Sequence, residues 1–326
     1  MSAQTPLVAP PKKRGRLYAL IAVAIVVVIA VIVGITIAVG NSGSSSDDAS
    51  GAGDNAIESG LGSAAQPVKL GVVGASDPYW DVFTDAAADA GIAVEITDFT
   101  DYAQPNPALT EGDLDLNQFQ HIIYLAQYNV SAEADVTPIG ATAIYPLGLY
   151  STKYSSVDDI EEGETVAIPS DASNLARGLL VLQASGLVEL EGGGSPFSTI
   201  DDVLDTSKVK VITLEAALTP TSLPDVAAAI INNDFVEDAG LAFEDALATD
   251  DPADASAQPY INIFAARAED KDNEVLLELV DIFQSTKAVT DGVLEVSGGT
   301  AVLVTTPVSE LEESLATVEK DYAASE

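Results

Sequence analysis

The chain has 326 residues and no cysteine, which excludes disulfide bonds, thiolate metal sites and lipidation at a signal-peptide cysteine. All 51 acidic residues but only nine of the 13 basic residues lie beyond residue 39, so that part carries a formal net charge of −42. So acidic a region argues against nucleic acids and anionic lipids as partners, and fits a domain kept soluble at a crowded surface or in salt.

An uncharged segment rich in Val and Ile covers residues 17–39. As a helix with a rise of about 1.5 Å per residue, it would span roughly 35 Å, enough to cross a hydrocarbon core. The four basic residues at positions 12–16 predict that residues 1–16 stay in the cytoplasm. We therefore predict a single-pass anchor in the cell membrane, with the rest of the chain on the extracytoplasmic face. A signal peptide cleaved after Ala38 or Gly40 is the alternative, although its apolar core is normally about 7–15 residues.

The composition changes to Gly, Ser, Ala and Asp over residues 40–66. Such a stretch buries too little apolar surface to offset the entropy lost on ordering, so we predict a flexible linker. The remaining 260 residues, 67–326, are many for one compact core and fit two lobes.

Strand and helix patterns alternate in the first part of this region. Residues 68–74 are a short apolar run bounded by glycine, which indicates a buried strand, and residues 80–90 have helical spacing. Trp80, the only tryptophan, either anchors this helix or lies at the rim of a binding cleft. A second strand at 92–98 and a short helix at 107–111 follow. The β-α-β-α order predicts an α/β lobe with a largely parallel sheet.

The alternation restarts after about residue 150. We predict strands at 165–169 and 209–214, and helices at 174–185 and 223–232. Gly186 directly follows the first of these helices and suits the left-handed conformation that ends many helices. A second α/β lobe is therefore expected.

Two long extended stretches, 141–151 and 260–267, separate these parts. They suggest a chain that leaves lobe one, builds lobe two and returns. The predicted division is 67–146 for the first part of lobe one, 147–259 for lobe two, and 260–326 for the return to lobe one with an acidic C-terminal tail. Two lobes on paired crossings enclose a cleft, where ligand pockets are common.

Side chains suited to catalysis or to holding a cofactor are scarce. His121 is the sole histidine, and no Gly-x-Ser-x-Gly nucleophile elbow is present. The glycine run at 192–194 has no lysine after it, so it is not a phosphate loop. No acidic cluster has metal-ligand spacing. We therefore predict a protein that is not an enzyme and uses neither a cofactor nor a metal.

Several motifs together resemble the NlpA/MetQ-type methionine-binding lipoprotein family. The most specific are an Asn-x-Phe-Gln-His block at 117–121 and an Asn-x-x-Arg block at 174–177. The resemblance runs in order from about residue 68 to 300, through the segments 99–109, 112–125, 145–151, 167–183, 229–232 and 259–262. Two departures stand out: residues 17–39 replace the lipid-modified cysteine usual in the family, and 25 residues follow the Gly-Gly-Thr-Ala stretch that begins at Gly298.

The resemblance implies a two-lobed α/β fold of the periplasmic-binding-protein type II, with two crossover strands. The transmembrane helix predicted from the uncharged segment would precede this fold. It implies closure on L-methionine or a related amino acid, and delivery to an ABC permease with its ATPase subunit. Three alternatives stay open: a methionine-containing dipeptide as ligand, another small apolar amino acid, or a non-transport adhesion or sensory module on the same fold.

Arg177 and two asparagines are the candidates for the polar end of the ligand. Arg177 falls in the first turn of the helix expected near Asn174, where a guanidinium can hold a carboxylate through two parallel hydrogen bonds. By residue type alone, it could pair with a protein carboxylate instead. Asn174 is an ordinary N-cap or a ligand contact, and both readings stay open. Asn232 would close an apolar helix, but the resemblance implies contact with the ligand's amino or carboxylate group.

Phe119, His121 and Tyr124 are the candidates for the apolar end of the ligand. Aromatic rings suit a thioether, because each sulfur–aromatic contact adds about 0.3–1.5 kcal/mol. By residue type alone, Phe119 and Tyr124 would be core residues, whereas the resemblance favours an aromatic pocket for the ligand side chain. Tyr102 and Asn106 are further candidates on the same ground.

Overall fold

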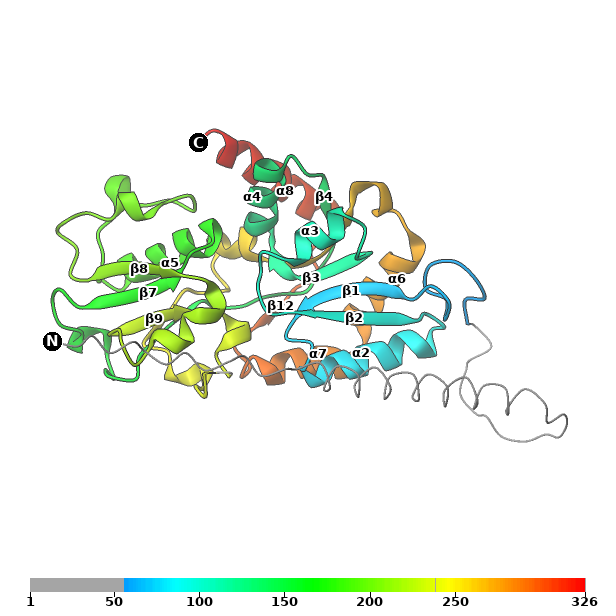
Figure 1. Ribbon diagram of the computed structural model, residues 1–326, viewed down its shortest axis with the longest axis horizontal. Helices are drawn as coiled ribbons and strands as arrows, with labels where there is room; N and C mark the ends of the chain where they lie inside the picture. Colours follow the sequence, from blue (N-terminus) through cyan, green and yellow to red (C-terminus); the bar gives the residue numbers. More distant parts are fainter. Residues whose placement is uncertain (1–55, 238, 326) are drawn as a thin grey trace, which may run out of the picture. The chain divides into compact units, whose positions relative to one another are not determined.

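The computed structural model describes residues 56–237 and 239–325, which form two α/β lobes, each around one five-stranded sheet (Figure 1). The first sheet has the strand order β2-β1-β3-β11-β4. Its strands are β1 (Val68–Val73), β2 (Val94–Phe99), β3 (Leu116–His121), β4 (Val136–Ala141) and β11 (Asn262–Arg267). β1 runs parallel to β2 and β3, whereas β11 runs antiparallel to β3 and β4. β11 therefore returns the chain to the first sheet after the second lobe.

The second sheet has the order β10-β6-β9-β7-β8. Its strands are β6 (Gly148–Tyr150), β7 (Thr165–Pro169), β8 (Lys210–Leu214), β9 (Ala228–Ile231) and β10 (Ala248–Thr249). β7 runs parallel to β8 and β9, whereas β6 runs antiparallel to β9 and β10. On the connection between the sheets, β5 (Ala143–Ile144) pairs with β12 (Val302–Leu303). The chain thus passes between the sheets twice, from β4 to β6 and from β10 to β11.

Helices cover both faces of the first sheet, with α2 and α7 on one side and α4 and α8 on the other (Figure 1). The α-helices of the described part are α2 (Pro78–Asp89), α3 (Pro105–Thr110), α4 (Ile122–Ala132), α5 (Ala172–Ala184), α6 (Glu274–Ser285), α7 (Lys287–Val296) and α8 (Val308–Ala323). Short 3-10 helices lie at Val157–Asp159, Glu191–Gly193, Ile200–Asp202, Ala216–Leu218, Pro220–Ser222, Asn233–Phe235, Phe243–Asp245, Ala255–Tyr260 and Ala268–Asp270.

Four aromatic side chains fill the core between α2, α6 and the first sheet. Trp80, Phe83, Phe264 and Phe283 are at most 2% exposed, and neighbouring ring centroids lie 5.2–6.4 Å apart. Tilted and edge-on ring pairs at this spacing add to the stabilisation from burial. Trp80 therefore anchors α2 and does not lie at the rim of a cleft.

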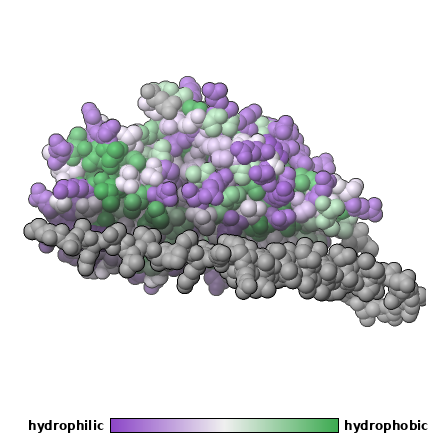
Figure 2. Space-filling view, viewed as in Figure 1, coloured by the Kyte–Doolittle hydropathy of each residue, from purple (hydrophilic) through white to green (hydrophobic). Residues whose placement is uncertain are grey.

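The C-terminal helix α8 packs on the opposite face of the same sheet. Leu311, Leu315 and Val318 repeat at helical spacing and are buried in a cluster with residues of α4. In the second lobe, α5 buries Leu179 and Leu182 against the sheet. Figure 2 shows hydrophilic residues over much of one face, as the acidic composition requires, with hydrophobic residues gathered mainly over the second lobe.

The strands predicted at 68–74, 92–98, 165–169 and 209–214 are confirmed to within two residues. The helix predicted at 223–232 is wrong, because Ala228–Ile231 is the strand β9, paired on both sides by β6 and β7. Its four residues are at most 1% exposed. A short run buried on both faces has the same apolar composition as a buried helix, and here strand pairing overrides the helix propensity of alanine.

The helix predicted at 174–185 begins two residues earlier, at Ala172. Asp171, not Asn174, is its N-cap, and Oδ1 of Asp171 accepts a hydrogen bond from the backbone N–H of Asn174 at 3.0 Å. Aspartate is as favourable an N-cap as asparagine, and Asp171 precedes Asn174 in the chain. The prediction that Arg177 lies in the first turn is therefore wrong: it is the sixth helical residue. Gly186 follows with φ of +72°, as predicted.

Within the described part of the chain, no helix is long and apolar enough to cross a membrane. The predicted cytoplasmic residues 1–16 and the predicted anchor at 17–39 lie outside the described residues. The last residues of the predicted linker, 56–66, are described, and Ile57 and Leu61 pack against the core of the first lobe.

Candidate ligand-binding site

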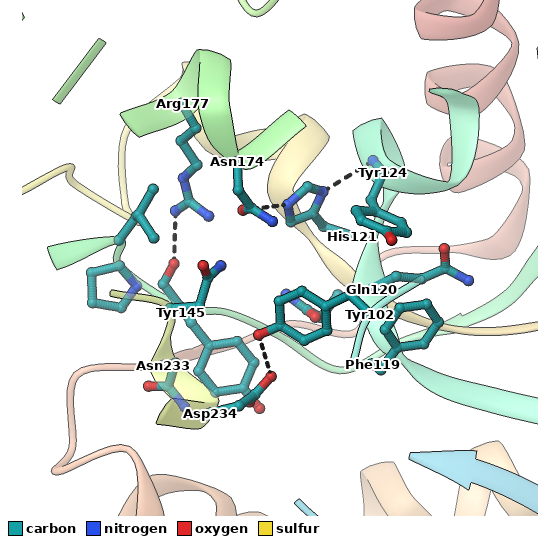
Figure 3. Close-up of a pocket in the computed structure, with 14 residues that line it drawn as sticks. Tyr102, Phe119, Gln120, His121, Tyr124, Tyr145, Asn174, Arg177, Asn233 and Asp234 are labelled. Carbon is teal, nitrogen blue, oxygen red and sulfur yellow. Dashed lines mark hydrogen bonds between the residues drawn. The ribbon is translucent and has the colours of Figure 1, made fainter. Parts of the chain in front are cut away.

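A pocket lies between the two lobes, at the end of β3 and beside both connections (Figure 3). It encloses about 440 Å³ of atom-free space, part of it open to solvent, of which only about 40 Å³ can hold the centre of a water molecule, so the lobes stand close together here. Of the eight predicted site residues, seven line it: Tyr102, Phe119, His121, Tyr124, Asn174, Arg177 and Asn232. The sequence motifs therefore converge on one place, although they come from both lobes.

His121 stands where β3 ends and α4 begins. Its backbone is extended, and its Nδ1 accepts a hydrogen bond from the backbone N–H of Tyr124 at 3.2 Å, so the imidazole is the N-cap of α4. Burial, and next the nearby charge of Arg177, lower the pKa of His121 from 6.5 to about 3. The ring is therefore neutral at pH 7. Since Nδ1 is an acceptor, Nε2 carries the proton.

A polar chain crosses from the first lobe to the second. Nε2 of His121 lies 3.4 Å from Oδ1 of Asn174, and Nδ2 of Asn174 donates to Oδ1 of Asp171 at 2.9 Å. The neutral imidazole can thus donate to Asn174, which in turn donates to the N-cap carboxylate of α5. Asn174 is a link between the lobes as well as a residue of the pocket wall.

Arg177 points from α5 towards the pocket with its side chain only 6% exposed. Nε donates to Oδ2 of Asp250 at 2.6 Å, and Nη2 donates to the backbone oxygen of Tyr145 at 2.7 Å. The guanidinium also lies over the ring of Tyr260, with 4.2 Å from Cζ to the centroid. A buried arginine needs such partners. Among the described residues these two oxygens are its only acceptors, so N–H groups remain for a ligand.

Three aromatic rings form another wall of the pocket. The centroids of Tyr102, Phe119 and Tyr124 lie 5.6–6.3 Å from one another. The hydroxyl of Tyr102 donates to Oδ2 of Asp234, from the second lobe, at 2.7 Å. Burial and this neighbouring carboxylate raise the pKa of Tyr102 well above its usual value. Phe119 is only 8% exposed, so it belongs to the core and to the pocket wall at once.

Asn232 and Asn233 follow β9 directly, at the start of a short 3-10 helix. The Oδ1 atoms of both are buried and have no hydrogen-bond partner among the described residues. A buried acceptor without a donor costs about 1–3 kcal/mol. Both residues line the pocket, so a ligand that brings its own donors would have acceptors there.

Asn106 is the predicted site residue that the pocket does not include. It lies behind the wall, where its Nδ2 donates to Oε1 of Gln120 at 2.7 Å and its Oδ1 accepts from Asn117 and Gln120 at 2.9 and 2.7 Å. This buried amide network fixes Gln120, which does line the pocket. Asn106 therefore meets the pocket only through its neighbour.

Seven further lining residues were not predicted: Gln120, Tyr145, Pro146, Leu147, Asn233, Asp234 and Asn262. Most lie inside motifs that carry the family resemblance or directly beside a predicted residue. Either position could have marked them as pocket residues. Tyr145, Pro146 and Leu147 lie on the first connection between the lobes, so the crossing prediction could have placed them at the cleft.

The model of the NlpA lipoprotein family matches residues 68–303, more than half of the chain. The chain belongs to the NlpA lipoprotein family. Among relatives of this NlpA-family chain, the D-methionine-binding lipoprotein MetQ of Escherichia coli (strain K12) is 38% identical over 224 residues, which are 67% of this chain and 81% of the relative. The probable D-methionine-binding lipoprotein MetQ of Pasteurella multocida is 35% identical over 240 residues, 72% of this chain and 86% of the relative.

Solved structures agree with the two-lobed fold of this NlpA-family chain. A nutrient binding protein from Burkholderia cenocepacia bound to methionine has a TM-score of 0.67 and 36% identity, covering 72% of this chain and 99% of that protein. The substrate binding protein of a methionine transporter from Streptococcus pneumoniae has a TM-score of 0.68 and 31% identity, covering 73% of this chain and 95% of that protein. The fold is therefore of the two-lobed periplasmic-binding type, and α8 lies beyond the residues that the family model matches.

Proposed function

We propose that this chain is the extracytoplasmic substrate-binding protein of an ABC importer and binds methionine, or a close relative of it, between its lobes. The observation that carries the proposal is the pocket: a buried guanidinium stands on one wall and aromatic rings on another, and two lining asparagines have amide oxygens with no partner among the described residues. A free amino acid with an apolar side chain has the matching groups. The relatives whose names or titles mention methionine support this ligand.

The polar end of the ligand would meet Arg177 and the two asparagines. The N–H groups of Arg177 that face away from Asp250 and Tyr145 can hold a carboxylate through two hydrogen bonds. The buried amide oxygens of Asn232 and Asn233 can accept hydrogen bonds from the ammonium group. Binding would then remove the cost of leaving these acceptors unpaired.

The apolar end of the ligand would lie against Tyr102, Phe119 and Tyr124. Sulfur–aromatic contacts favour a thioether there. His121 adds a ring without a charge, because its pKa lies near 3. A cationic side chain such as lysine would lose its hydration against these rings, so the wall selects for an apolar side chain.

Closure of the two lobes would complete the site. The proposed lobes are residues 67–146 with 260–326, and residues 147–259, joined by the two connections. Tyr102 with Asp234, and His121 with Asn174, already join residues of the two lobes by hydrogen bonds beside the pocket. A hinge motion on the connections would open these contacts and release the ligand to the permease.

The N-terminal residues would tether this domain to the membrane. We propose that residues 17–39 span the cell membrane, with residues 1–16 in the cytoplasm and 40–55 as the linker, since Ile57 and Leu61 already pack against the binding domain. The chain has no cysteine for lipid attachment, and the uncharged segment supplies another anchor. Partners on the membrane would be an ABC permease and its ATPase subunit.

Ligand identification tests the proposal directly. Protein purified without denaturation would be analysed by native mass spectrometry, and ligand-free protein titrated calorimetrically with L-methionine, D-methionine and L-leucine. We expect co-purified methionine and binding at least about tenfold tighter for one methionine enantiomer than for L-leucine, since sulfur–aromatic contacts and pocket shape discriminate. Co-purification of a dipeptide, or no binding of either methionine enantiomer, would overturn the ligand assignment.

A further inference from the structure

Arg177 enters the pocket with one edge of its guanidinium already occupied. Nε donates to Asp250 and Nη2 donates to the backbone oxygen of Tyr145. Nε and Nη2 form one edge of the planar group, so the N–H groups of Nη1 and the second N–H of Nη2 point along a different edge. That second edge is the one available to a carboxylate in the pocket.

Asp250 is itself held in place on its other side. Its Oδ1 accepts a hydrogen bond from the backbone N–H of Leu147 at 2.8 Å, so each carboxylate oxygen has a partner. Asp250 does not line the pocket and directly follows β10. It therefore touches the pocket arginine from behind and fixes it relative to the first connection between the lobes.

Both connections between the lobes meet at Arg177. Tyr145 and Leu147 belong to the first connection, and Asp250 and Tyr260 belong to the second. The ring of Tyr260 supports one face of the guanidinium, while Asp250 and Tyr145 hold one edge. An arginine side chain that is free in solution would occupy many rotamers, whereas these contacts restrict Arg177.

We propose that Asp250 is a positioning residue for recognition of the ligand carboxylate, acting through Arg177. This inference rests on the proposed function, because it requires a ligand with a carboxylate. By holding Nε, Asp250 keeps the free edge of the guanidinium towards the pocket before the ligand arrives, so less side-chain freedom is lost on binding.

The negative charge of Asp250 has an opposing effect, since it weakens the attraction of Arg177 for a second anion. Two observations make positioning the larger effect. The two anions would use different edges of the guanidinium, so they do not compete for the same N–H groups. The Asp250 side chain is also 26% exposed, so solvent partly screens its charge, whereas its hydrogen bond to Arg177 is short.

The substitution Asp250→Asn tests the inference, because asparagine keeps the shape but cannot accept both hydrogen bonds. Wild type and variant would be titrated with L-methionine and with L-methioninol, which has the ammonium and the thioether but no carboxylate. We expect L-methionine to bind about tenfold more weakly to the variant, a loss typical of one charge-assisted hydrogen bond, with L-methioninol changed by less than about twofold.

Two further variants separate position from charge and from folding. Asp250→Glu keeps the charge but moves the carboxylate, so it should show the same selective loss for L-methionine. Asp251→Asn is the matched control: Asp251 is exposed, and within the described part of the chain its side chain accepts only from the backbone N–H of Ala253. This substitution should leave the binding of both ligands unaffected. Thermal unfolding of each variant would show that it is folded.

Equal losses for L-methionine and L-methioninol would mean that Asp250 merely supports the fold, and the inference would be wrong. Unchanged or tighter binding of L-methionine by Asp250→Asn would mean that its charge outweighs its positioning, which also overturns the inference. If wild type itself binds neither ligand, the proposed function fails first and this inference with it. These outcomes are distinguishable in one set of titrations.

Discussion

The substitution His121→Asn tests the electrostatics of the pocket most directly. The imidazole is buried, its Nδ1 caps α4 at Tyr124, and its Nε2 faces Asn174. Burial and the charge of Arg177 lower its pKa from 6.5 to about 3. An asparagine places Oδ1 near the position of Nδ1, so it retains the cap of α4 while it removes the titrating group.

The sign of the pH effect follows from the depressed pKa. Between about pH 6.5 and about pH 3, the unfolded chain holds a proton on His121 that the folded chain lacks. The free energy of unfolding therefore rises with pH across this window. The contribution of His121 is complete above about pH 6.5 and is lost on acidification. One pKa unit corresponds to about 1.4 kcal/mol, so acidification to about pH 4.5 costs wild type on the order of 3 kcal/mol through this group.

The measurement is urea unfolding of ligand-free wild type and variant at about pH 7 and about pH 4.5. At about pH 7 the variant should be less stable by about 1 kcal/mol, because it loses the contact of Nε2 with Asn174. At about pH 4.5 the order should reverse. Titrating carboxylates contribute alike to both proteins and cancel in the difference.

Asn174→Ala is the matched control for this experiment, since it breaks the same contact but leaves the histidine in place. Its unfolding free energy should fall on acidification more steeply than that of His121→Asn, because the histidine still titrates. A stability difference between wild type and His121→Asn that is the same at both pH values would refute the reasoning.

Three other substitutions have separable outcomes. Arg177→Ala should weaken methionine binding at least about tenfold in calorimetry, through loss of a charge-assisted contact. Arg267→Ala should not, because Arg267 pairs with Asp115 and Asp270 and does not line the pocket. Tyr102→Phe loses the hydrogen bond to Asp234 and should weaken binding by about two- to tenfold, and unchanged affinity would show that this bond does not matter to closure. Leu311→Ala, at a site 1% exposed in α8, should lower the unfolding free energy by about 2–5 kcal/mol in urea without changing affinity.

The alternation of strands and helices could be predicted from the sequence because it depends on the local spacing of apolar residues. Short runs with β-branched residues became β1, β2, β7 and β8. The same logic failed at Ala228–Ile231, where a run of alanine and isoleucine fits a buried helix or a buried strand equally. Only its neighbours β6 and β7, which pair on both of its edges, decide between the two.

The site could be predicted only as far as motifs mark it. Seven predicted residues line one pocket, yet Asp250 gave no signal, because it is one of 51 acidic residues and lies 73 positions from Arg177 in the chain. The N-cap of α5 was misplaced for a related reason: Asp171 and Asn174 are both suitable caps, and spacing alone does not choose between them. Residue pairs far apart in the chain, and choices between neighbouring residues of similar capping ability, therefore cannot be predicted from the sequence.

The residues proposed to contact the ligand also hold the protein together, and this shapes how any substitution must be interpreted. His121 caps a helix, Asn174 links the lobes and Tyr102 bonds to Asp234 across the cleft. A ligand that contacts both sides of the pocket binds better when these interlobe bonds are formed, so binding and closure are coupled through the same side chains. A lost bond therefore lowers affinity by disfavouring closure as well as by removing a contact. Titration with a truncated ligand distinguishes the two effects, because only a lost contact depends on which group the ligand lacks.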